Sequence, residues 1–183
     1  MQHQDGLDEL LRSGVPVKHL GIGECVFTRE ESIISTVLGS CVSATFFHAP
    51  THAAGSFHAV MPTCTEARSV KPPCHYVDSA IEALLWRFDR IGARRAELRV
   101  QLYGGGCLLR GEAAQLADAR HHASLDVGAR NVAVAKAELA RRRLRFEEVC
   151  TRGRKGRKLL FHTATGRAWC RFVEVEAAGC RPR

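Results

Sequence analysis

The chain has 183 residues and a mass of 20.2 kDa, the size of one ordinary domain, so it can bury a core without a metal or a disulfide. Its composition, 45% hydrophobic and 25% charged residues, excludes wholesale disorder, and no apolar run approaches the roughly 20 residues that span a bilayer. The net charge is +8, and residues 130–183 hold 15 Lys and Arg against 5 Asp and Glu, or +10. We expect a cytoplasmic protein without membrane insertion, because the N-terminus also lacks the layout of a secretory signal.

The predicted elements begin after a short appended arm at residues 1–16. Short runs rich in β-branched and aromatic residues predict strands, and apolar residues at helical spacing predict helices. The predicted strands are 32–38, 42–47, 56–61, 97–103, 144–149, 159–161 and 168–175, and the predicted helices are 77–91 and 131–143. Residues 63–75 are predicted to form a loop because Pro72 and Pro73 lie within them. The pattern favours one α+β domain over residues 17–176 in which strands predominate, followed by a basic tail at 177–183.

The eight cysteines show no metal-binding or disulfide pattern. They stand at positions 25, 41, 64, 74, 107, 150, 170 and 180, and no two have the C-x-x-C spacing that brings two thiolates to one zinc ion. In a reducing compartment such cysteines stay as free thiols. We therefore predict no metal and no cofactor, and a functional cysteine must be recognised from its neighbours.

The segment Leu38–Val42 joins two predicted strands through small residues and a cysteine. Gly39 and Ser40 remove bulk beside Cys41 and allow backbone amides to point at a bound carbonyl, as in an oxyanion hole. His58 lies seventeen residues later in an apolar strand. If the strands are adjacent, an imidazole beside the thiol forms an ion pair that lowers the thiol pKa and generates a nucleophile.

A third group must orient the histidine ring, and the hydroxyls of Ser35 and Thr36 are the nearest candidates. Structural interpretations of the same residues exist. A lone cysteine between strands is usually a core residue, and a lone histidine in an apolar strand is usually a hydrogen-bonded core residue. Spacing alone leaves these alternatives open.

The sequence resembles the CheD family of chemoreceptor glutamine deamidases. The resemblance is carried, in order, by blocks spread over about residues 17–175: Ser35–Val42, His58–Pro62, Tyr76 with the helix after it, Gln101–Gly106, Gly128–Asn131, and Gly156–Lys158 with Phe161 and Gly166. Leu-Gly-Ser-Cys with a histidine seventeen residues later is the most specific of these features.

This resemblance implies that Cys41 is the nucleophile and that His58 is the general base and acid. The family's third member is a threonine six residues before the cysteine; that position is Ser35 here, with Thr36 adjacent. The implied reaction hydrolyses a protein glutamine to glutamate through a thioester. The implied fold is a single-domain α/β sandwich of mixed, mostly antiparallel strands with flanking helices, as in Cys–His toxin deamidases.

Two positions depart from the family pattern. Phe57 stands where asparagine is usual before the histidine, and Arg152 stands where glycine is usual in a later loop, which indicates a different loop path or a more basic substrate rim. Further candidates for the substrate region are Phe57, Gly104, Gly105, Arg130 and Asn131. A tight strand exit explains the glycines equally well, and a turn with a helix N-cap equally explains Asn131.

The expected partners are methyl-accepting chemotaxis receptors, whose signalling regions are acidic helical coiled coils suited to a basic surface. The resemblance also implies docking to a chemotaxis phosphatase in some bacteria. No nucleic-acid motif accompanies the positive charge, so we expect no nucleic-acid partner. The main alternative function is a receptor-binding module of the same fold with little or no catalysis. A peptidase fits Cys–His chemistry but lacks support from the family.

Overall fold

The strands form two sheets that face each other. The structure, a computed structural model, describes residues 6–64, 73–107 and 126–173. The four-stranded sheet has the order β1–β3–β8–β9, and the five-stranded sheet has the order β2–β5–β4–β6–β7. Their bounds are β1 Val17–His19, β2 Cys25–Thr28, β3 Ile33–Leu38, β4 Val42–His48, β5 Ala53–Phe57, β6 Leu98–Gly104, β7 Phe146–Thr151, β8 Gly156–His162 and β9 Ala168–Val173.

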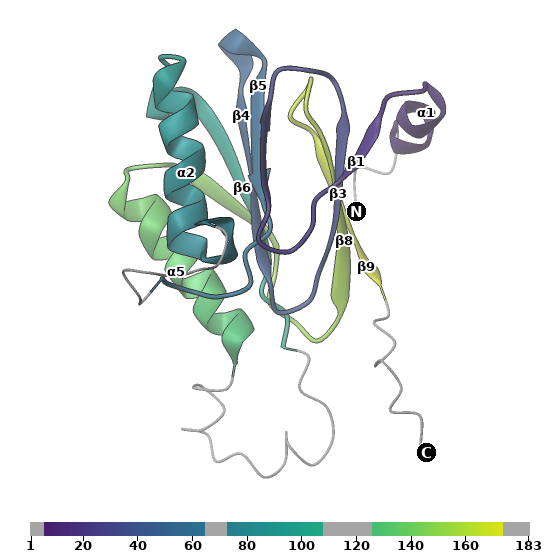
Figure 1. Ribbon diagram of the computed structural model, residues 1–183. Coiled ribbons are helices and arrows are strands. Elements are labelled where there is room, and N and C mark those ends of the chain that lie inside the picture. Colours follow the sequence, from purple (N-terminus) through teal and green to yellow (C-terminus); the bar gives the residue numbers. More distant parts are fainter. Residues whose placement is uncertain (1–5, 65–72, 108–125, 174–183) are drawn as a thin grey trace.

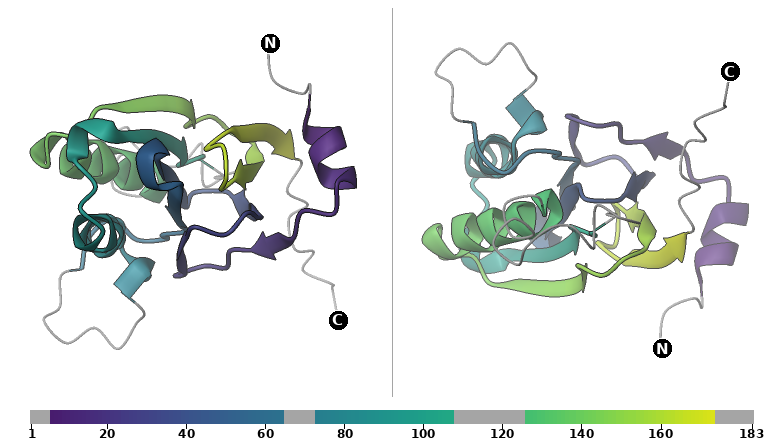
Figure 2. Two further views of the ribbon diagram at one scale, coloured as in Figure 1. Left: turned by 90° about the horizontal axis from the view of Figure 1, so that it is seen from above. Right: turned by 90° about the horizontal axis from the view of Figure 1, so that it is seen from below.

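Helices cover the outer faces of this sandwich. The helices α2 (Val77–Arg90) and α5 (Val127–Arg141) lie on the five-stranded sheet, and α1 (Leu7–Arg12) lies on the far side of the four-stranded sheet (Figures 1 and 2). Only the β1–β3 and β6–β7 pairs are parallel among the paired strands described. The predicted α+β sandwich of mostly antiparallel strands is confirmed.

The helix α2 forms as its apolar spacing predicts. Val77, Ile81, Leu84, Leu85 and Phe88 are at most 2% exposed and pack on the five-stranded sheet. By contrast, α5 begins four residues before the predicted start. Its N-cap is Asp126, whose carboxylate accepts a hydrogen bond from the Ala129 amide at 2.8 Å, so the prediction that Asn131 caps this helix is wrong.

Gly128, which the sequence pattern assigns to a turn, lies in the first turn of α5. A Cβ atom there would lie 2.5 Å from the carbonyl oxygen of Gly106, so the glycine permits close packing of helix on strand. The sequence analysis also missed β1 and β2. Both are short, and β1 begins at the predicted boundary between the arm and the domain. The boundary at residue 17 stays a prediction; α1 packs Leu7 against Trp169 on the outer face of the four-stranded sheet.

Two of the connections between the sheets meet at one end of the sandwich, where residues 20–24 also carry the chain from β1 to β2. Residues 39–41 connect β3 to β4, and residues 152–155 connect β7 to β8. The end of β6 lies between these two crossings, because the Gly106 amide donates to the Gly39 carbonyl and the Arg152 amide donates to the Gly104 carbonyl, both at 2.8 Å. Cys41 belongs to the first crossing.

Candidate active site

Cys41 and His58 point to the same face of the five-stranded sheet. Between them in register lie Val42 and Ala59, which exchange two backbone hydrogen bonds of 2.9 Å and are fully buried on the helix-covered face. Because successive side chains of a strand point to opposite faces, Cys41 and His58 point inward, between the two sheets. The two side chains share a face, but no hydrogen bond joins the thiol to the imidazole among the described residues.

A neighbouring serine pair shows how near this register brings such side chains. In this register Ser43 lies opposite position 58, and Ser56 is two positions before it. The hydroxyl oxygens of Ser43 and Ser56 are 3.1 Å apart. His58 stands in the same diagonal relation to Cys41, one step along the same pair of segments. Diagonal neighbours on one face of a sheet lie within reach of longer side chains. The thiol and the imidazole are therefore diagonal neighbours.

Thr36 fixes the orientation of the His58 ring from the opposite sheet. Its hydroxyl donates its single proton to the Leu20 carbonyl at 2.8 Å, and its oxygen lies 2.8 Å from His58 Nδ1. The oxygen must then accept from the ring, which puts the proton on Nδ1 and leaves Nε2 with a free lone pair in the neutral imidazole. Nε2 is the ring atom that can take a proton.

Burial keeps the pair uncharged. Cys41 is 9% exposed and His58 is 4% exposed, and His58 Nε2 has no hydrogen-bond partner among the described residues. Burial raises the pKa of the Cys41 thiol and lowers the pKa of His58, against smaller opposing effects from the Cys41 amide and the Leu20 carbonyl. The predicted resting ion pair with a lowered thiol pKa is therefore wrong, because desolvation penalises both charged forms.

The turn that carries Cys41 is held by its carbonyl groups. The Gly39 carbonyl accepts from the Gly106 amide at 2.8 Å, and the Cys41 carbonyl accepts from the Gly105 amide at 2.7 Å. Between them, the Ser40 carbonyl accepts from Asn131 Nδ2 at 3.0 Å. In a trans peptide the next amide points away from its carbonyl, so the Cys41 amide points away from Asn131 and toward its own sulfur.

Gly104 and Gly105 are buried behind the Cys41 turn and do not form an open substrate surface. Gly104 has φ +105°, and a Cβ atom there would lie 2.2 Å from the Cys41 carbonyl oxygen. Gly105 has φ +65°, and a Cβ atom there would overlap Val132 of α5. Both glycines therefore allow the strand end to pack against the cysteine turn, and the carbonyl contacts hold that turn.

Three predicted site residues do not join this cluster. Ser35 shares the outward side of β3 with Ile33, whose side chain packs under α1, so Ser35 points away from His58. Phe57 is fully buried against the helices, on the face opposite to its neighbour His58. The Arg130 side chain is exposed on α5.

Known proteins match this chain over most of its length. The family model described as "CheD chemotactic sensory transduction" matches residues 60–172. The "Probable chemoreceptor glutamine deamidase CheD" of Oleidesulfovibrio alaskensis is 43% identical over 90% of this chain and 76% of its own length. Its counterpart in Nitratidesulfovibrio vulgaris is 44% identical over 85% and 76%, and that of Pyrococcus horikoshii is 33% identical over 84% and 91%.

The chain belongs to the CheD family. Among solved structures, the "Crystal Structure of Neisseria meningitidis protein NMB0706, family-model DUF152" aligns with 11% identity and a TM-score of 0.41, covering 80% of this chain and 66% of that one. That similarity is too weak to indicate a function. In the described part of this CheD chain, no helix has both the length and the apolar character needed to cross a membrane.

Arg152, which stands where the CheD pattern has glycine, adopts a backbone conformation typical of glycine. Arg152 has φ +63°, in the left-handed region that favours glycine. Its guanidinium pairs with Asp126, the N-cap of α5, at 2.8 Å and also donates to the Gly105 carbonyl at 3.3 Å. The side chain therefore ties the second crossing to α5 instead of adding a free charge to the rim.

Sequence analysis missed one residue that supports this end of the sandwich. Arg157 lies in a Gly/Arg-rich run that is typical of a solvated loop, yet it is fully buried in β8. Its guanidinium donates to the carbonyls of Gly104 at 3.0 Å and Cys150 at 2.5 Å, and also to that of Arg152. Only a register that pairs this run with the buried strand β3 would have indicated its burial.

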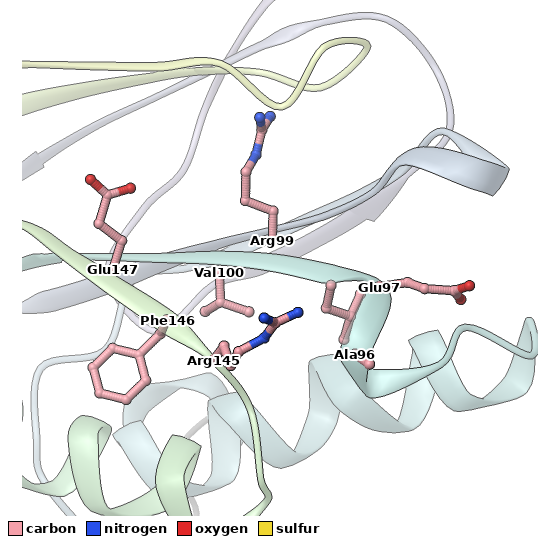
Figure 3. A pocket seen from close by; sticks show the side chains of 8 residues that line it. Ala96, Glu97, Arg99, Val100, Arg145, Phe146 and Glu147 are labelled. Atoms are coloured by element: carbon pink, nitrogen blue, oxygen red, sulfur yellow. The ribbon is translucent and has the colours of Figure 1, made fainter.

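A hollow beside the start of β6 lies away from this cluster. A hollow of about 380 Å³ is lined by residues 96–100 and 145–147, where β6 and β7 begin (Figure 3). Gly104, which touches the cysteine turn, is at the opposite end of β6. Cys41 and His58 do not line this hollow and are only 9% and 4% exposed, so a substrate must displace neighbouring side chains to reach the sulfur.

Proposed function

We propose that this protein is a protein-glutamine deamidase that hydrolyses glutamine side chains of chemoreceptors to glutamate with release of ammonia. The observation that carries the proposal is the hydrogen bond from His58 Nδ1 to Thr36, which leaves Nε2 free on the face that Cys41 shares. Membership in the CheD family supplies the substrate class, since its curated relatives carry the name chemoreceptor glutamine deamidase. No cofactor is needed for this hydrolysis.

The first half of the reaction is acyl transfer to sulfur. His58 Nε2 takes the proton of the Cys41 thiol as the sulfur attacks the carboxamide carbon. The oxyanion that forms accepts a hydrogen bond from the Cys41 amide, which Asn131 holds in place through the Ser40 carbonyl. His58 then returns the proton to the leaving nitrogen, and ammonia departs to leave a thioester on Cys41.

The second half is hydrolysis of the thioester. Water attacks the thioester carbon while His58 Nε2 takes a proton from it, and the proton passes to the leaving sulfur. The products are a glutamate side chain and the free Cys41 thiol. Thr36 stabilises the ring in both halves, since its oxygen accepts from Nδ1 whether His58 is neutral or charged. We assign the orienting role to Thr36 in preference to Ser35.

The burial of the site favours a second candidate function. Because Cys41 is 9% and His58 is 4% exposed, a receptor could dock on this fold without reaching the sulfur, as a binding module would. The two functions differ in their product. Deamidation changes the receptor covalently, whereas docking leaves its mass unchanged.

The partner and its location are part of the proposal. An acidic helical coiled coil suits the net +10 of residues 130–183, although part of this charge is used internally. Arg152 pairs with Asp126 and Arg142 pairs with Glu82, for example, and both acids lie outside the segment. We further propose that the enzyme acts in the cytoplasm and docks to a chemotaxis phosphatase. Deamidation that slows steeply with added salt would support steering by charge.

The decisive experiment uses a purified receptor signalling fragment and peptide mass mapping. The wild-type enzyme should raise the mass of individual glutamine-containing peptides by about one dalton and release ammonia in equal amount. A His58→Ala variant, folded as judged by circular dichroism, should leave the peptides unchanged. Tight binding of the fragment by wild type without any mass gain would favour the binding module instead.

A further inference from the structure

Two further cysteines meet beside the Cys41 cluster. Cys150 comes from β7, the edge strand of the five-stranded sheet, and Cys170 comes from β9, the edge strand of the four-stranded sheet. Both are half-buried and pack against the group formed by Leu38, Cys41, Tyr103 and Leu159. Cys150 pairs in register with Tyr103 and Cys170 pairs with Leu159, so both thiols face the space between the sheets, where those two residues pack.

The setting of Cys150 favours its thiolate. Arg157 is fully buried, its backbone partners are carbonyl oxygens, and no carboxylate pairs with it among the described residues. A buried cation without a carboxylate stabilises a nearby anion. The hydrogen bond from Cys170, followed by the charge of Arg157, lowers the pKa of Cys150 to about 6, and the same bond raises the pKa of Cys170.

Another thiol pair provides an internal comparison. Cys25 of β2 and Cys74 also share a hydrogen bond, and this bond lowers the pKa of Cys25 to about 7. Cys74 is 3% exposed, however, and the cation that acts on this pair, Arg87, is exposed to solvent. Solvent screens that charge. Cys150 therefore combines the stronger cation with two accessible thiols.

We propose that Cys150 and Cys170 form a peroxide-reactive dithiol that closes to a disulfide between the two sheets. The Cys150 thiolate attacks a peroxide oxygen, an S–O bond forms, the O–O bond breaks, and the hydroxide released takes a proton as water. The Cys170 sulfur then attacks the sulfenic sulfur of Cys150, the S–O bond breaks, and the thiol proton leaves with the hydroxide as a second water. Two thiols are oxidised and one hydrogen peroxide is reduced to two waters.

The disulfide should restrain access to Cys41. A glutamine side chain reaches the sulfur only if the packed group around Cys41 opens, and Cys150 and Cys170 form one border of that group. A covalent link there joins the edges of the two sheets and opposes their separation. This effect on Cys41 follows from packing alone; any effect on turnover rests also on the proposed deamidase activity.

The first test maps the disulfide in the full-length protein. Fully reduced protein is treated with one equivalent of hydrogen peroxide, blocked with an alkylating reagent, and digested with trypsin. We expect a loss of about two daltons in the intact protein and a linked pair of the peptides 146–152 and 168–171. A Cys170→Ser variant should instead stop at a sulfenic acid on Cys150, which a sulfenic-acid-specific reagent traps. A link between Cys25 and Cys74 with Cys150 and Cys170 still reduced would overturn the proposal.

The second test measures the reactivity of Cys41 and does not need a substrate. Alkylation of Cys41 by iodoacetamide should slow at least tenfold after oxidation of the wild-type protein, and dithiothreitol should restore it. The matched controls are Cys170→Ser, in which oxidation should leave the rate within twofold, and Cys25→Ser, in which it should slow as in wild type. Equal slowing in Cys170→Ser and wild type would contradict the proposal that the Cys150–Cys170 disulfide restrains access to Cys41, whatever the deamidase assay gives.

Discussion

The two faces of the five-stranded sheet do different work. The face under α2 and α5 is apolar, and its largest side chains, such as Phe46 and Phe57, are fully buried. The face toward the four-stranded sheet carries Ser43, Ser56 and His58. Stability is concentrated on the first face, and the polar groups that can do chemistry are concentrated on the second.

The difference has a physical cause. A helix-covered face offers few hydrogen-bond partners to a buried side chain, because helix backbone groups bond within the helix. The opposite sheet supplies partners, as Thr36 and the Leu20 carbonyl do for His58. Adjacent residues can therefore have opposite roles: Phe57 supports folding and His58 faces the site.

The largest loss of activity should come from a substitution on the face between the two sheets. A Cys41→Ala substitution removes the nucleophile, so deamidation of a receptor fragment should fall by roughly 10⁴-fold or more. The melting temperature should stay close to that of wild type, because a small side chain replaces another. Residual activity within tenfold of wild type would show that another group attacks the carboxamide.

A substitution on the outer face should have the opposite signature. Replacing Phe57 by Ala opens a cavity in the main core and should cost roughly 3–5 kcal/mol of unfolding free energy by urea titration. Activity per folded molecule should change far less than in Cys41→Ala. If Phe57→Ala instead kept its stability and lost substrate affinity, Phe57 would be a substrate contact.

Two adjacent hydroxyl residues of β3, Ser35 and Thr36, point to opposite faces of the four-stranded sheet. The Thr36→Val change keeps the shape but removes the acceptor for His58 Nδ1, so kcat should fall by roughly 10²-fold. The Thr36→Ser variant should recover most of that loss. The Ser35→Ala variant should stay within about twofold of wild type, since Ser35 lies on the outward side. The reverse ranking of Ser35 and Thr36 would contradict the orientation described above.

The pH dependence should reflect a neutral pair. His58 must be unprotonated to act as a base, and burial lowers its pKa below the ordinary 6.5. The value of kcat/KM should therefore be constant near neutrality and fall only as the pH drops below that lowered pKa. Because burial also raises the thiol pKa, a preformed thiolate contributes nothing at pH 7. A resting ion pair would instead lose activity as the pH rises through a raised histidine pKa.

Sequence patterns predicted the parts of this fold with clear periodicity. The helix α2 and the strands β3, β4 and β6 lie close to their predicted ranges, and the resemblance to the CheD family indicated Cys41 and His58. The choice between Ser35 and Thr36 was not available from the pattern. Both faces of β3 are buried, one under α1 and one against the other sheet, so its apolar residues do not alternate.

Other features depend on contacts between distant segments. Arg157 is buried because four backbone carbonyls, those of Gly104, Cys150, Arg152 and Lys155, converge on its guanidinium, and no local pattern encodes this. The Leu20 carbonyl that fixes the Thr36 hydroxyl is a backbone group, so its position is invisible in the residue types. The depth of burial at Cys41, which reverses the expected pKa shift, also depends on packing between the sheets.

The protonation state of His58 in the resting enzyme tests the account most directly. Nitrogen-15 NMR of the imidazole rings, assigned with His58→Gln, distinguishes the two ring nitrogens and follows them with pH. The account predicts a proton on Nδ1, a bare Nε2, and a titration below pH 6.5. A proton on Nε2, or an imidazolium that persists above pH 7 and disappears in Cys41→Ala, would contradict it.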